Sequence, residues 1–142
     1  MKKKAIICDL DGTLALLNGR DPFDPSTAHN DLLNEPVANI IKVYNNQTLF
    51  AIDLFLITGR YDMYRPQTIK WLEKHGITHY KALYMRNTGD NRKDTVVKRE
   101  LYEKYIKNDY DVLFVLEDRD QVVHMWRKEL GLTCLQVEYG DF

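Results

Sequence analysis

Apolar residues along the chain occur in short runs that are separated by longer amphipathic segments. Five of these runs have the length of a β-strand: Ala5 to Cys8, Phe50 to Ile57, Ala82 to Met85, Val112 to Leu116 and Thr133 to Val137. Runs such as FLIT and VLFVL have few polar positions for a solvent-exposed face, which is typical of central strands covered on both faces. The alternation of strands with helices predicts a parallel sheet in an α/β three-layer sandwich.

Four helices are predicted in addition to the strands: Glu35 to Asn45, Met63 to His75, Asp94 to Ile106 and Gln121 to Leu130. Asn34 is the expected cap of the first helix, and Pro36 lies in its first turn. The buried stripe of that helix is expected to consist of Val37, Ile40, Ile41 and Tyr44. Gly76 and Gly131 are expected to end the second and fourth helices in the left-handed conformation. The longest irregular segment, Ala15 to Asn34, is rich in Asn, Asp, Pro and Gly, and a segment of that length is usually functional or disordered.

Length and composition indicate one globular domain, residues 1–142. Of its 142 residues, 44% are hydrophobic and 29% are charged, and the net charge is −1. A protein that coats nucleic acid non-specifically is normally strongly basic, so any nucleic-acid contact here must be local. Cys8 and Cys134 lie in predicted strands and are expected to be reduced core residues. The apolar run after the N-terminal lysines is too short for a signal peptide or a membrane span, so a cytoplasmic location without membrane contact is expected.

Polar residues follow four of the five predicted strands, at the end of the sheet where ligands of open parallel sheets bind. In chain order they are Asp9, Asp11, Gly12 and Thr13, then Thr58, Gly59 and Arg60, then Arg86 with GDNRKD, and finally Glu117, Asp118 and Arg119. Carboxylates combined with hydroxyl, arginine and lysine groups predict a magnesium (Mg2+) and phosphate site. A carboxylate beside magnesium can act as a covalent nucleophile, and a second acid two residues away can protonate the leaving group.

The motif DLDGTL after a strand, followed by TGR, by a lysine on the third helix and by EDR after VLFVL, resembles the haloacid dehalogenase superfamily of aspartyl-phosphate phosphotransferases. Within that superfamily, NGRDPFD, RNTGDNRKDTVVK, EDRDQVVHMWR and the terminal GDF are most similar to the 3′-phosphatase domain of bacteriophage polynucleotide kinase/phosphatase. The resemblance covers nearly the whole chain. It implies a haloacid dehalogenase-like fold with a five-stranded parallel Rossmann-like sheet and a minimal cap or none.

The resemblance also implies roles for individual residues. Asp9 would be the nucleophile and Asp11 the general acid and base. Thr58 and the Gly59 backbone would bind the transferred phosphoryl group. The implied magnesium ligands are Asp9, the Asp11 backbone carbonyl and Asp118. Further implied phosphate-binding residues are Arg20, Arg60, Arg86 and Arg119, and the implied supporting residues are Asp31, Asp94 and Glu117.

Two lysines near the start of the third helix compete for the catalytic role. Lys98 is favoured over Lys93, because KDTVVK aligns its final lysine with the catalytic one and because Asp94, four residues earlier, could orient the ammonium. The chain departs from the phage pattern at Thr58, where the phage domain has serine, and at Glu117, where it has aspartate. The longer glutamate leaves open whether Glu117 reaches the metal through water or positions Lys98.

Several of these residues also have a structural interpretation. Asp31 could cap a turn, and Glu117 could pair with a nearby lysine without contacting substrate. Arg86 and Arg119 could be solvated ion-pair partners. DxDG also begins calcium loops, but the glutamate that completes such a loop is absent. Residues expected to be purely structural or exposed are Arg92, Lys93, the four histidines (His29, His75, His79 and His124) and the core tryptophans Trp71 and Trp126.

The expected substrate follows from the lack of room for a cap domain. Between Thr13 and Phe50 the chain fits only a flap-like loop and one helix, so an open site for a phosphate on a large substrate is expected. The prediction is a magnesium-dependent polynucleotide 3′-phosphatase that acts on nucleic acid 3′-phosphate ends through an aspartyl-phosphate. One alternative is a capless phosphatase for a nucleotide, a small phosphomonoester or a phosphoprotein, and another is a non-enzymatic receiver or end-binding module. This sequence has no P-loop, and it does not determine an oligomeric state.

Overall fold

The main sheet consists of five parallel strands. The computed structural model describes residues 2–46 and 51–142. In this part of the chain the strand order is β5-β4-β1-β6-β7, and every neighbouring pair is parallel, which confirms the predicted sheet. The strands are β1 (Lys3–Cys8), β4 (Ile52–Tyr61), β5 (Ala82–Arg86), β6 (Tyr110–Glu117) and β7 (Cys134–Gln136).

The second predicted strand differs from β4 at both ends. Phe50, the predicted first residue, lies outside the described residues. At the other end β4 continues to Tyr61, so Thr58, Gly59 and Arg60 belong to the strand itself. A shift in the pairing of β4 with β5 falls between Thr58 and Tyr61, where the strand leaves regular register at the edge of the sheet.

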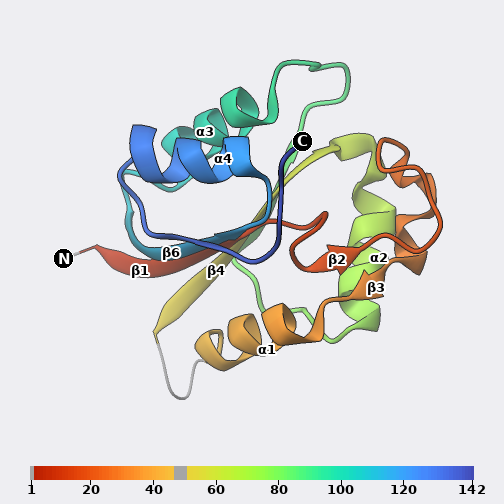
Figure 1. Cartoon of the computed structure of the whole chain (residues 1–142). Helices are drawn as coiled ribbons and strands as arrows, with labels where there is room; N and C mark the ends of the chain where they lie inside the picture. Colours follow the sequence, from red (N-terminus) through yellow and green to blue (C-terminus); the bar gives the residue numbers. More distant parts are fainter. Residues whose placement is uncertain (1, 47–50) are drawn as a thin grey trace.

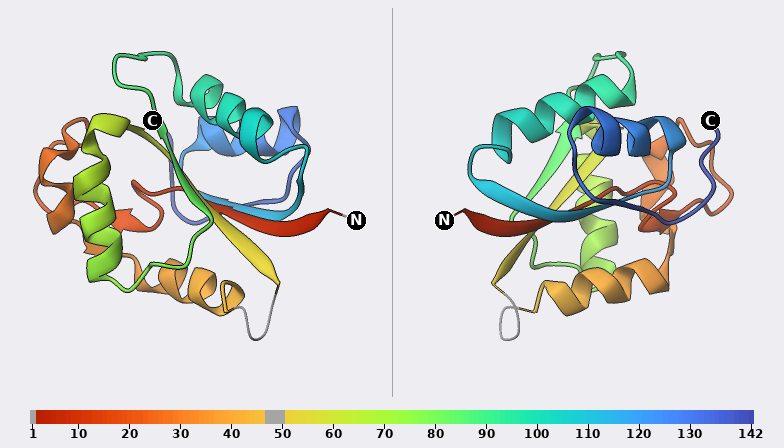
Figure 2. Two further views of the ribbon diagram at one scale, coloured as in Figure 1. Left: turned by 180° about the vertical axis from the view of Figure 1, so that it is seen from behind. Right: turned by 60° about the vertical axis from the view of Figure 1, so that its left-hand side comes forward.

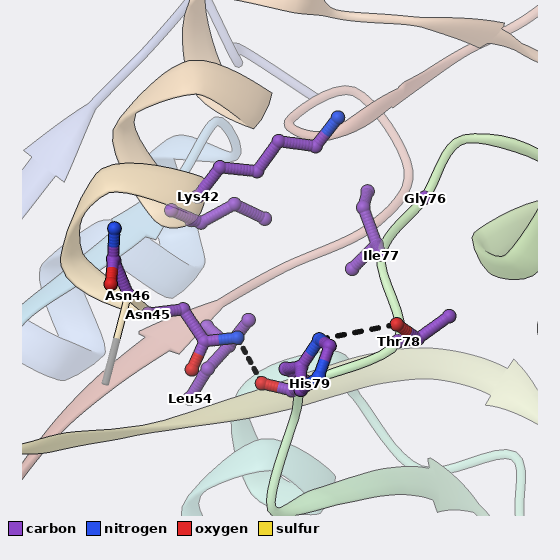
Figure 3. A pocket seen from close by; sticks show the side chains of 9 residues that line it. Lys42, Asn45, Asn46, Leu54, Gly76, Ile77, Thr78 and His79 are labelled. Atoms are coloured by element: carbon purple, nitrogen blue, oxygen red, sulfur yellow. Dashed lines mark hydrogen bonds between the residues drawn. The ribbon is translucent and has the colours of Figure 1, made fainter. Parts of the chain in front are cut away.

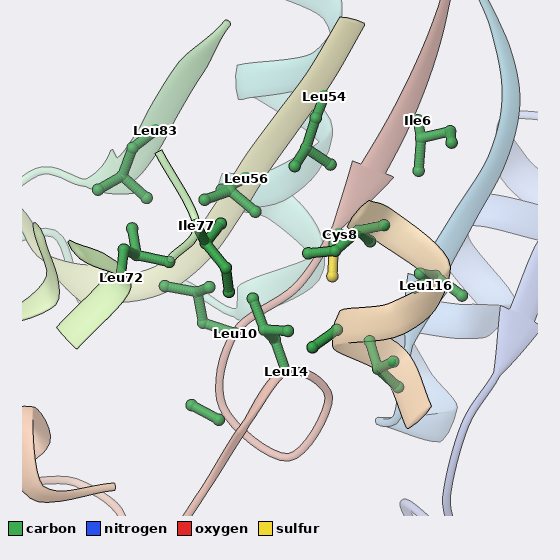
Figure 4. Packing of buried hydrophobic residues seen from close by; sticks show 14 of the residues in the cluster. Ile6, Cys8, Leu10, Leu14, Leu54, Leu56, Leu72, Ile77, Leu83 and Leu116 are labelled. Carbon is green, nitrogen blue, oxygen red and sulfur yellow. The ribbon is translucent and has the colours of Figure 1, made fainter. Parts of the chain in front are cut away.

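Helices cover both faces of the sheet, which confirms the three-layer sandwich (Figures 1 and 2). Alternate residues of a strand point to opposite faces. Ile6 and Leu54 therefore pack toward α1 (Glu35–Tyr44) and α2 (Arg65–Lys74), as the close view of this cluster shows (Figure 4). Ile7 and Phe55 pack on the other face, toward α3 (Asp94–Tyr105) and α4 (Asp120–His124). A π-helical turn, Met125–Glu129, continues α4.

The predicted helix ends are confirmed in part. Gly76 and Gly131 adopt φ angles of +72° and +68°, the left-handed conformation expected of them. On α1, Val37 and Ile41 are buried as predicted, but Ile40 is 37% exposed and Ala38 takes its place against the sheet. The 3.6-residue period explains the error, because positions 37, 38, 41 and 44 share one face.

Asn34 stands at the N-cap position of α1, but its side chain makes no capping bond. The Asn34 Nδ2 atom instead donates to the backbone oxygen of Thr13, 2.8 Å away. On α2, a 3-10 turn over Asp62–Tyr64 precedes the helix, which begins at Arg65 rather than at Met63.

The segment between Thr13 and α1 is ordered rather than irregular. The short strands β2 (Ala15–Leu16) and β3 (Leu32–Leu33) pair antiparallel and enclose a 3-10 helix, Pro25–Asn30. This flap (residues 15–33) lies beside α2 in the views of Figures 1 and 2. Trp71 of α2 donates its Nε1 hydrogen to the Asp31 backbone oxygen at 2.7 Å and so ties the flap to the helix.

Other expectations about the core are confirmed. Trp71 and Trp126 are buried, and Cys8 and Cys134 are buried free cysteines. Among the described residues, no helix combines the length and the apolar character that crossing a membrane requires.

Candidate active site

The carboxyl end of β1 lies between the carboxyl ends of its two neighbours. Cys8, the last residue of β1, pairs with Leu56 on β4 and with Leu116 on β6. Asp9 follows directly, and its backbone N–H donates to the Leu116 oxygen at 3.0 Å. The side chains predicted from three separate motifs therefore meet at this edge.

One group of side chains at this edge is rich in carboxylates; we refer to Asp9, Lys98, Glu117 and Asp118 as the acidic cluster. All four residues are buried. The Lys98 Nζ atom donates to Asp9 Oδ1 and to Glu117 Oε1, each at 2.8 Å. Of the two candidate lysines, Lys98 is thus the one that contacts the predicted nucleophile, whereas Lys93 is exposed.

Glu117 is fully engaged within the protein. One carboxylate oxygen accepts from Lys98, and Oε2 accepts from the Asp118 backbone N–H at 3.1 Å. The geometry therefore favours the second of the two roles left open for Glu117, the positioning of Lys98. The orienting role of Asp94 stays a prediction: its charge helps to raise the pKa of Lys98, but Lys98 makes its hydrogen bonds to Asp9 and Glu117. The Asp94 carboxylate accepts from Arg86 and Arg119 instead, because helical side chains lean toward the helix N-terminus and Asp94 is the first residue of α3.

The acidic cluster has too little positive charge for its carboxylates. Burial and then the charge of Asp9 raise the pKa of Glu117 well above its usual value and the pKa of Asp118 to about 7. Burial disfavours the charged form of Lys98, but Asp9, Glu117 and Asp94 outweigh it, and the pKa of Lys98 is raised well above its usual value. Three buried carboxylates thus share one ammonium group, an arrangement that favours binding of a further cation.

The donor set fits magnesium. Carboxylate oxygens of Asp9, Glu117 and Asp118 all lie within 4.8 Å of one another. Both Glu117 oxygens and Asp9 Oδ1 accept from Lys98 or the backbone, which leaves Asp9 Oδ2 and the Asp118 carboxylate, next to the Thr13 hydroxyl, as the better placed donors, and hard oxygen donors are what magnesium prefers. The Thr13 hydroxyl lies 3.0 Å from Asp9 Oδ2 and 3.1 Å from Asp118 Oδ1 and donates to one of them, a structural link that was not among the predicted site residues. Its position directly after DxDG was the available signal.

Gly12 explains how the loop after β1 comes so close to Asp118. Its φ is +82°, and a Cβ at this position would overlap the Asp118 carboxylate. Glycine adopts such a φ without steric cost. The DxDGT motif therefore combines two carboxylates with a turn that only glycine accommodates here.

The second group at the edge is an arginine cluster of Asp11, Arg20, Asp31 and Arg60. Arg60 donates to both Asp11 oxygens, at 2.9 and 2.7 Å, and Arg20 donates to Asp11 Oδ1 at 2.8 Å. Arg20 also donates to both Asp31 oxygens at 2.8 Å each, and Arg60 lies 3.2 Å from Asp31 Oδ2. The Asp31 side chain is therefore an anchor for two guanidinium groups.

Three separate elements hold the arginine cluster. Arg20 comes from the flap and Arg60 from β4, and the Arg60 Nη1 atom also donates to Thr68 of α2 at 3.0 Å. Burial opposes ionisation of Asp11, but the hydrogen bonds and charges of Arg60 and Arg20 outweigh it, so that the pKa of Asp11 is lowered.

The remaining predicted residues form a third set of contacts next to the acidic cluster. Thr58 is buried, and its hydroxyl oxygen accepts from the Arg60 backbone N–H at 3.2 Å. Gly59 lies so close to Asp94 that a Cβ would overlap the carboxylate. Arg86 donates to the Gly59 oxygen at 2.7 Å and to Asp94. The partners of Arg86 are protein atoms outside the acidic cluster. Its predicted contact with phosphate stays a prediction.

A pocket at the opposite edge of the sheet is separate from this site (Figure 3). It is lined by residues that include Lys42, Asn45 and His79. Polar lining groups already have protein partners: the Asn45 amide donates to the backbone oxygen of His79, and Lys42 donates to the backbone oxygen of His75, just outside the lining, at 3.0 Å. We assign no site to it.

The fold and the acidic cluster together define a haloacid dehalogenase-like protein, with an aspartate pair at the end of the central strand of a parallel sheet. The family model of the polynucleotide kinase PNKP phosphatase domain matches residues 3–142. The chain therefore belongs to this family of phosphatase domains.

Two proteins that are similar to this chain are longer than it is. A putative bifunctional polynucleotide kinase/RNA ligase of Autographa californica nuclear polyhedrosis virus is 35% identical over 127 residues, which are 87% of this chain and 18% of that protein. In the solved structure of the Pnkp1/Rnl/Hen1 complex, a 52% identical chain matches with a TM-score of 0.94 over 99% of this chain and 48% of that one. The chain thus spans less than half the length of these relatives.

More distant structures share the fold alone. A hydrolase from Streptococcus pneumoniae is 20% identical, with a TM-score of 0.62 over 98% of this chain and 95% of that one. A class C acid phosphatase from Bacillus anthracis is also 20% identical, with a TM-score of 0.63 over 99% of this chain and 70% of that one.

Proposed function

We propose that this protein is a magnesium-dependent polynucleotide 3′-phosphatase, which removes the phosphate from nucleic acid 3′ ends through an aspartyl-phosphate on Asp9. The observation that carries the proposal is the convergence of Asp9, Lys98 and Asp118 in one buried cluster, with Arg20 and Arg60 around Asp11 beside it. Membership of the polynucleotide kinase phosphatase domain family supports it. A further solved structure, described as a Pnkp1/Rnl/Hen1 RNA repair complex, contains a 51% identical chain and supports a nucleic acid substrate.

The first chemical step is attack by an Asp9 carboxylate oxygen on phosphorus. A bond forms between that oxygen and phosphorus, and the bond from phosphorus to the 3′ oxygen breaks. Asp11 gives its proton to the departing 3′ oxygen, which leaves as a hydroxyl. In the second step Asp11 takes a proton from water, the water oxygen bonds to phosphorus, and the bond to Asp9 breaks to release inorganic phosphate.

Asp11 must be protonated to act as the acid, and the arginine cluster controls the pKa of its carboxyl group. Without substrate, Arg60 and Arg20 hold its pKa below the usual value, after overcoming the opposite effect of burial. Phosphate oxygens compete for the same guanidinium groups, since guanidinium binds phosphate in a two-pronged geometry. The negative charge of the phosphate then favours the protonated form of Asp11, so substrate binding prepares the acid.

Lys98 and Glu117 support the nucleophile. The Lys98 ammonium holds Asp9 Oδ1 at 2.8 Å, and the Thr13 hydroxyl lies 3.0 Å from Asp9 Oδ2, so that both contacts orient the attacking carboxylate. Glu117 keeps the ammonium in place through a second bond at 2.8 Å. Magnesium, when bound by the Asp9 carboxylate, the Asp11 backbone carbonyl and Asp118, would offset the repulsion between the anionic nucleophile and the anionic phosphate.

A direct assay tests the substrate. Phosphate release would be measured from RNA and DNA oligonucleotides with a 3′-phosphate, and from small aliphatic phosphomonoesters, at saturating magnesium. We expect kcat/KM to be at least about tenfold higher for an oligonucleotide, because binding contacts remote from the reacting phosphate lower the barrier. Higher kcat/KM on the small esters would favour a capless phosphatase for small substrates.

A further inference from the structure

The C-terminal strap, residues 138–142, returns to the carboxyl edge of the sheet and lies on Asp118 and Arg119. The Gly140 oxygen accepts from the Asp120 backbone N–H at 2.9 Å. The Phe142 oxygen accepts from Arg119 Nε at 2.7 Å and from Gln121 Nε2 at 3.1 Å. The strap is therefore held by backbone bonds beside a residue of the acidic cluster.

Gly140 allows this close approach. A Cβ at Gly140 would overlap the Asp118 backbone oxygen, so only glycine fits there without displacing the strap. Gly140 is buried, but the aromatic residues on either side are not: Phe142 is 62% exposed and Tyr139 is 93% exposed. The backbone of the strap is fixed while its aromatic rings face solvent.

A chain of contacts places Phe142 at the rim of the proposed phosphate site. The Arg119 guanidinium carbon lies 5.2 Å from the centre of the Phe142 ring. The same guanidinium donates to Asp94 Oδ2 at 3.2 Å, and Asp94 packs against the Gly59 backbone. Three contacts, through Arg119 and Asp94, thus connect the ring to Gly59 on β4.

We propose that Phe142, with Arg119 beside it, forms a stacking surface for the base of the nucleotide that carries the 3′-phosphate. The proposal rests on the proposed function and names the part of the substrate, besides the phosphate, that the site recognises. Aromatic rings and arginine planes are the surfaces on which proteins stack unpaired bases. The net charge of −1 provides little general attraction for nucleic acid, so recognition of the 3′ end requires local contacts of this kind.

The anchored backbone makes Phe142 suited to this role. Because bonds from Arg119 and Gln121 already fix the backbone oxygen of Phe142, binding a base would order only one side chain with two rotatable bonds. The base is linked through its sugar to the phosphate, so a base on Phe142 and a phosphate near Asp9 belong to one substrate.

The experiment compares Phe142→Ala with the unchanged protein on two single-stranded oligonucleotide 3′-phosphates. One carries a purine on the terminal sugar, and the other has the same sugar without a base. On the purine substrate, Phe142→Ala should lower kcat/KM about tenfold and Phe142→Tyr should restore it, because stacking tolerates any aromatic ring. On the abasic substrate the Phe142→Ala protein and the unchanged protein should agree within about twofold.

Three outcomes would overturn the proposal: an equal loss on both substrates, no loss on either, or an equal loss from Tyr139→Ala, which removes a more exposed ring from the same strap. A thermal unfolding curve for each variant separates loss of stacking from displacement of the strap. Failure of the proposed function would look different, since the unchanged protein would then not release phosphate from either oligonucleotide.

Discussion

The acidic cluster and the arginine cluster are built from neighbouring residues, but their charges balance differently. Asp9 and Asp11 are two positions apart, yet Asp9 shares one ammonium with Glu117 beside the further carboxylate of Asp118, whereas Asp11 and Asp31 share two guanidinium groups. The acidic cluster carries an excess of negative charge and raises the pKa of Asp118 to about 7. The arginine cluster is neutral by count and lowers the pKa of Asp11, although burial opposes this.

The difference shows how one short motif can serve two steps of a reaction. A carboxylate cluster that lacks positive charge attracts a cation, and guanidinium groups that are held by carboxylates can exchange those partners for phosphate oxygens. Magnesium would balance the excess negative charge of the acidic cluster, whereas phosphate would replace carboxylate oxygens as the partner of the guanidinium groups.

The largest effect is expected from Asp9→Asn. The amide cannot form the aspartyl-phosphate, so phosphate release should fall at least about 1,000-fold, or about 4 kcal/mol in the activation barrier. The measurement is release of inorganic phosphate from a 3′-phosphorylated oligonucleotide. Asp111→Asn is the matched control, because Asp111 is half-exposed and pairs only loosely with Lys4 at 3.4 Å. Retained release in Asp9→Asn would exclude Asp9 as the nucleophile.

Lys98→Met tests the charge balance of the acidic cluster through stability. Removing the ammonium leaves the buried carboxylates of Asp9 and Glu117 without their shared partner, so the free energy of unfolding should fall by about 3–5 kcal/mol. Urea unfolding without magnesium measures it. Lys93→Met, at an exposed position on the same segment, should change stability by less than about 0.5 kcal/mol. Adding Glu117→Gln to Lys98→Met should recover part of the loss, and no recovery would contradict the pairing.

Magnesium should stabilise the acidic cluster specifically. At a concentration of about 100 times its Kd, the ion should raise the free energy of unfolding by about 2.7 kcal/mol, and chelation with EDTA should reverse the effect. Asp118→Asn should abolish most of this increase, because it removes one of the two available carboxylates. Asp31→Asn, in the arginine cluster, should leave the response to magnesium intact. Equal loss in both variants would contradict the assignment of the metal to one cluster.

The smallest effect concerns Asp94, which like Asp11 is a carboxylate held by two arginines. Burial disfavours its ionised form, but the charges of Lys98, Arg86 and Arg119 outweigh burial, and the pKa of Asp94 is lowered. Because the folded pKa lies below the unfolded one, the ionised carboxylate stabilises the fold above the unfolded pKa. This contribution is lost as the pH falls through the folded pKa. Asp94→Asn should therefore cost about 2 kcal/mol at pH 7.

The pH dependence of the stability difference serves as the control for Asp94→Asn. The difference in urea unfolding between Asp94→Asn and the unchanged protein should shrink below about pH 4, near the unfolded pKa of an aspartate. A difference that stays constant down to pH 3 would mean that the lost stability comes from packing and not from charge.

Local sequence patterns identified most of the fold. Apolar runs and helical periodicity located the strands and four helices, because side-chain spacing along a strand or helix is a local property. The errors lie where contacts with residues distant in the sequence determine the position of a side chain. Ile40 is more exposed than its apolar character suggested, and the Asn34 side chain bonds Thr13 across 21 positions instead of capping its own helix. The β2–β3 pair was not predicted, since strands of two residues are too short for a periodic pattern.

For the candidate site, the sequence by itself determined which residues would gather. Carboxyl ends of neighbouring parallel strands share an edge, so Asp9, Thr58 and Asp118 had to lie close together once the strands were located. Only the tertiary structure decided their partners. Lys98 pairs with Asp9 and Glu117, Asp94 turns to Arg86 and Arg119, and Asp11 lies between Arg20 and Arg60. These pairings join segments far apart in the chain, and their geometry depends on the direction in which each side chain leaves its element, which spacing alone does not contain.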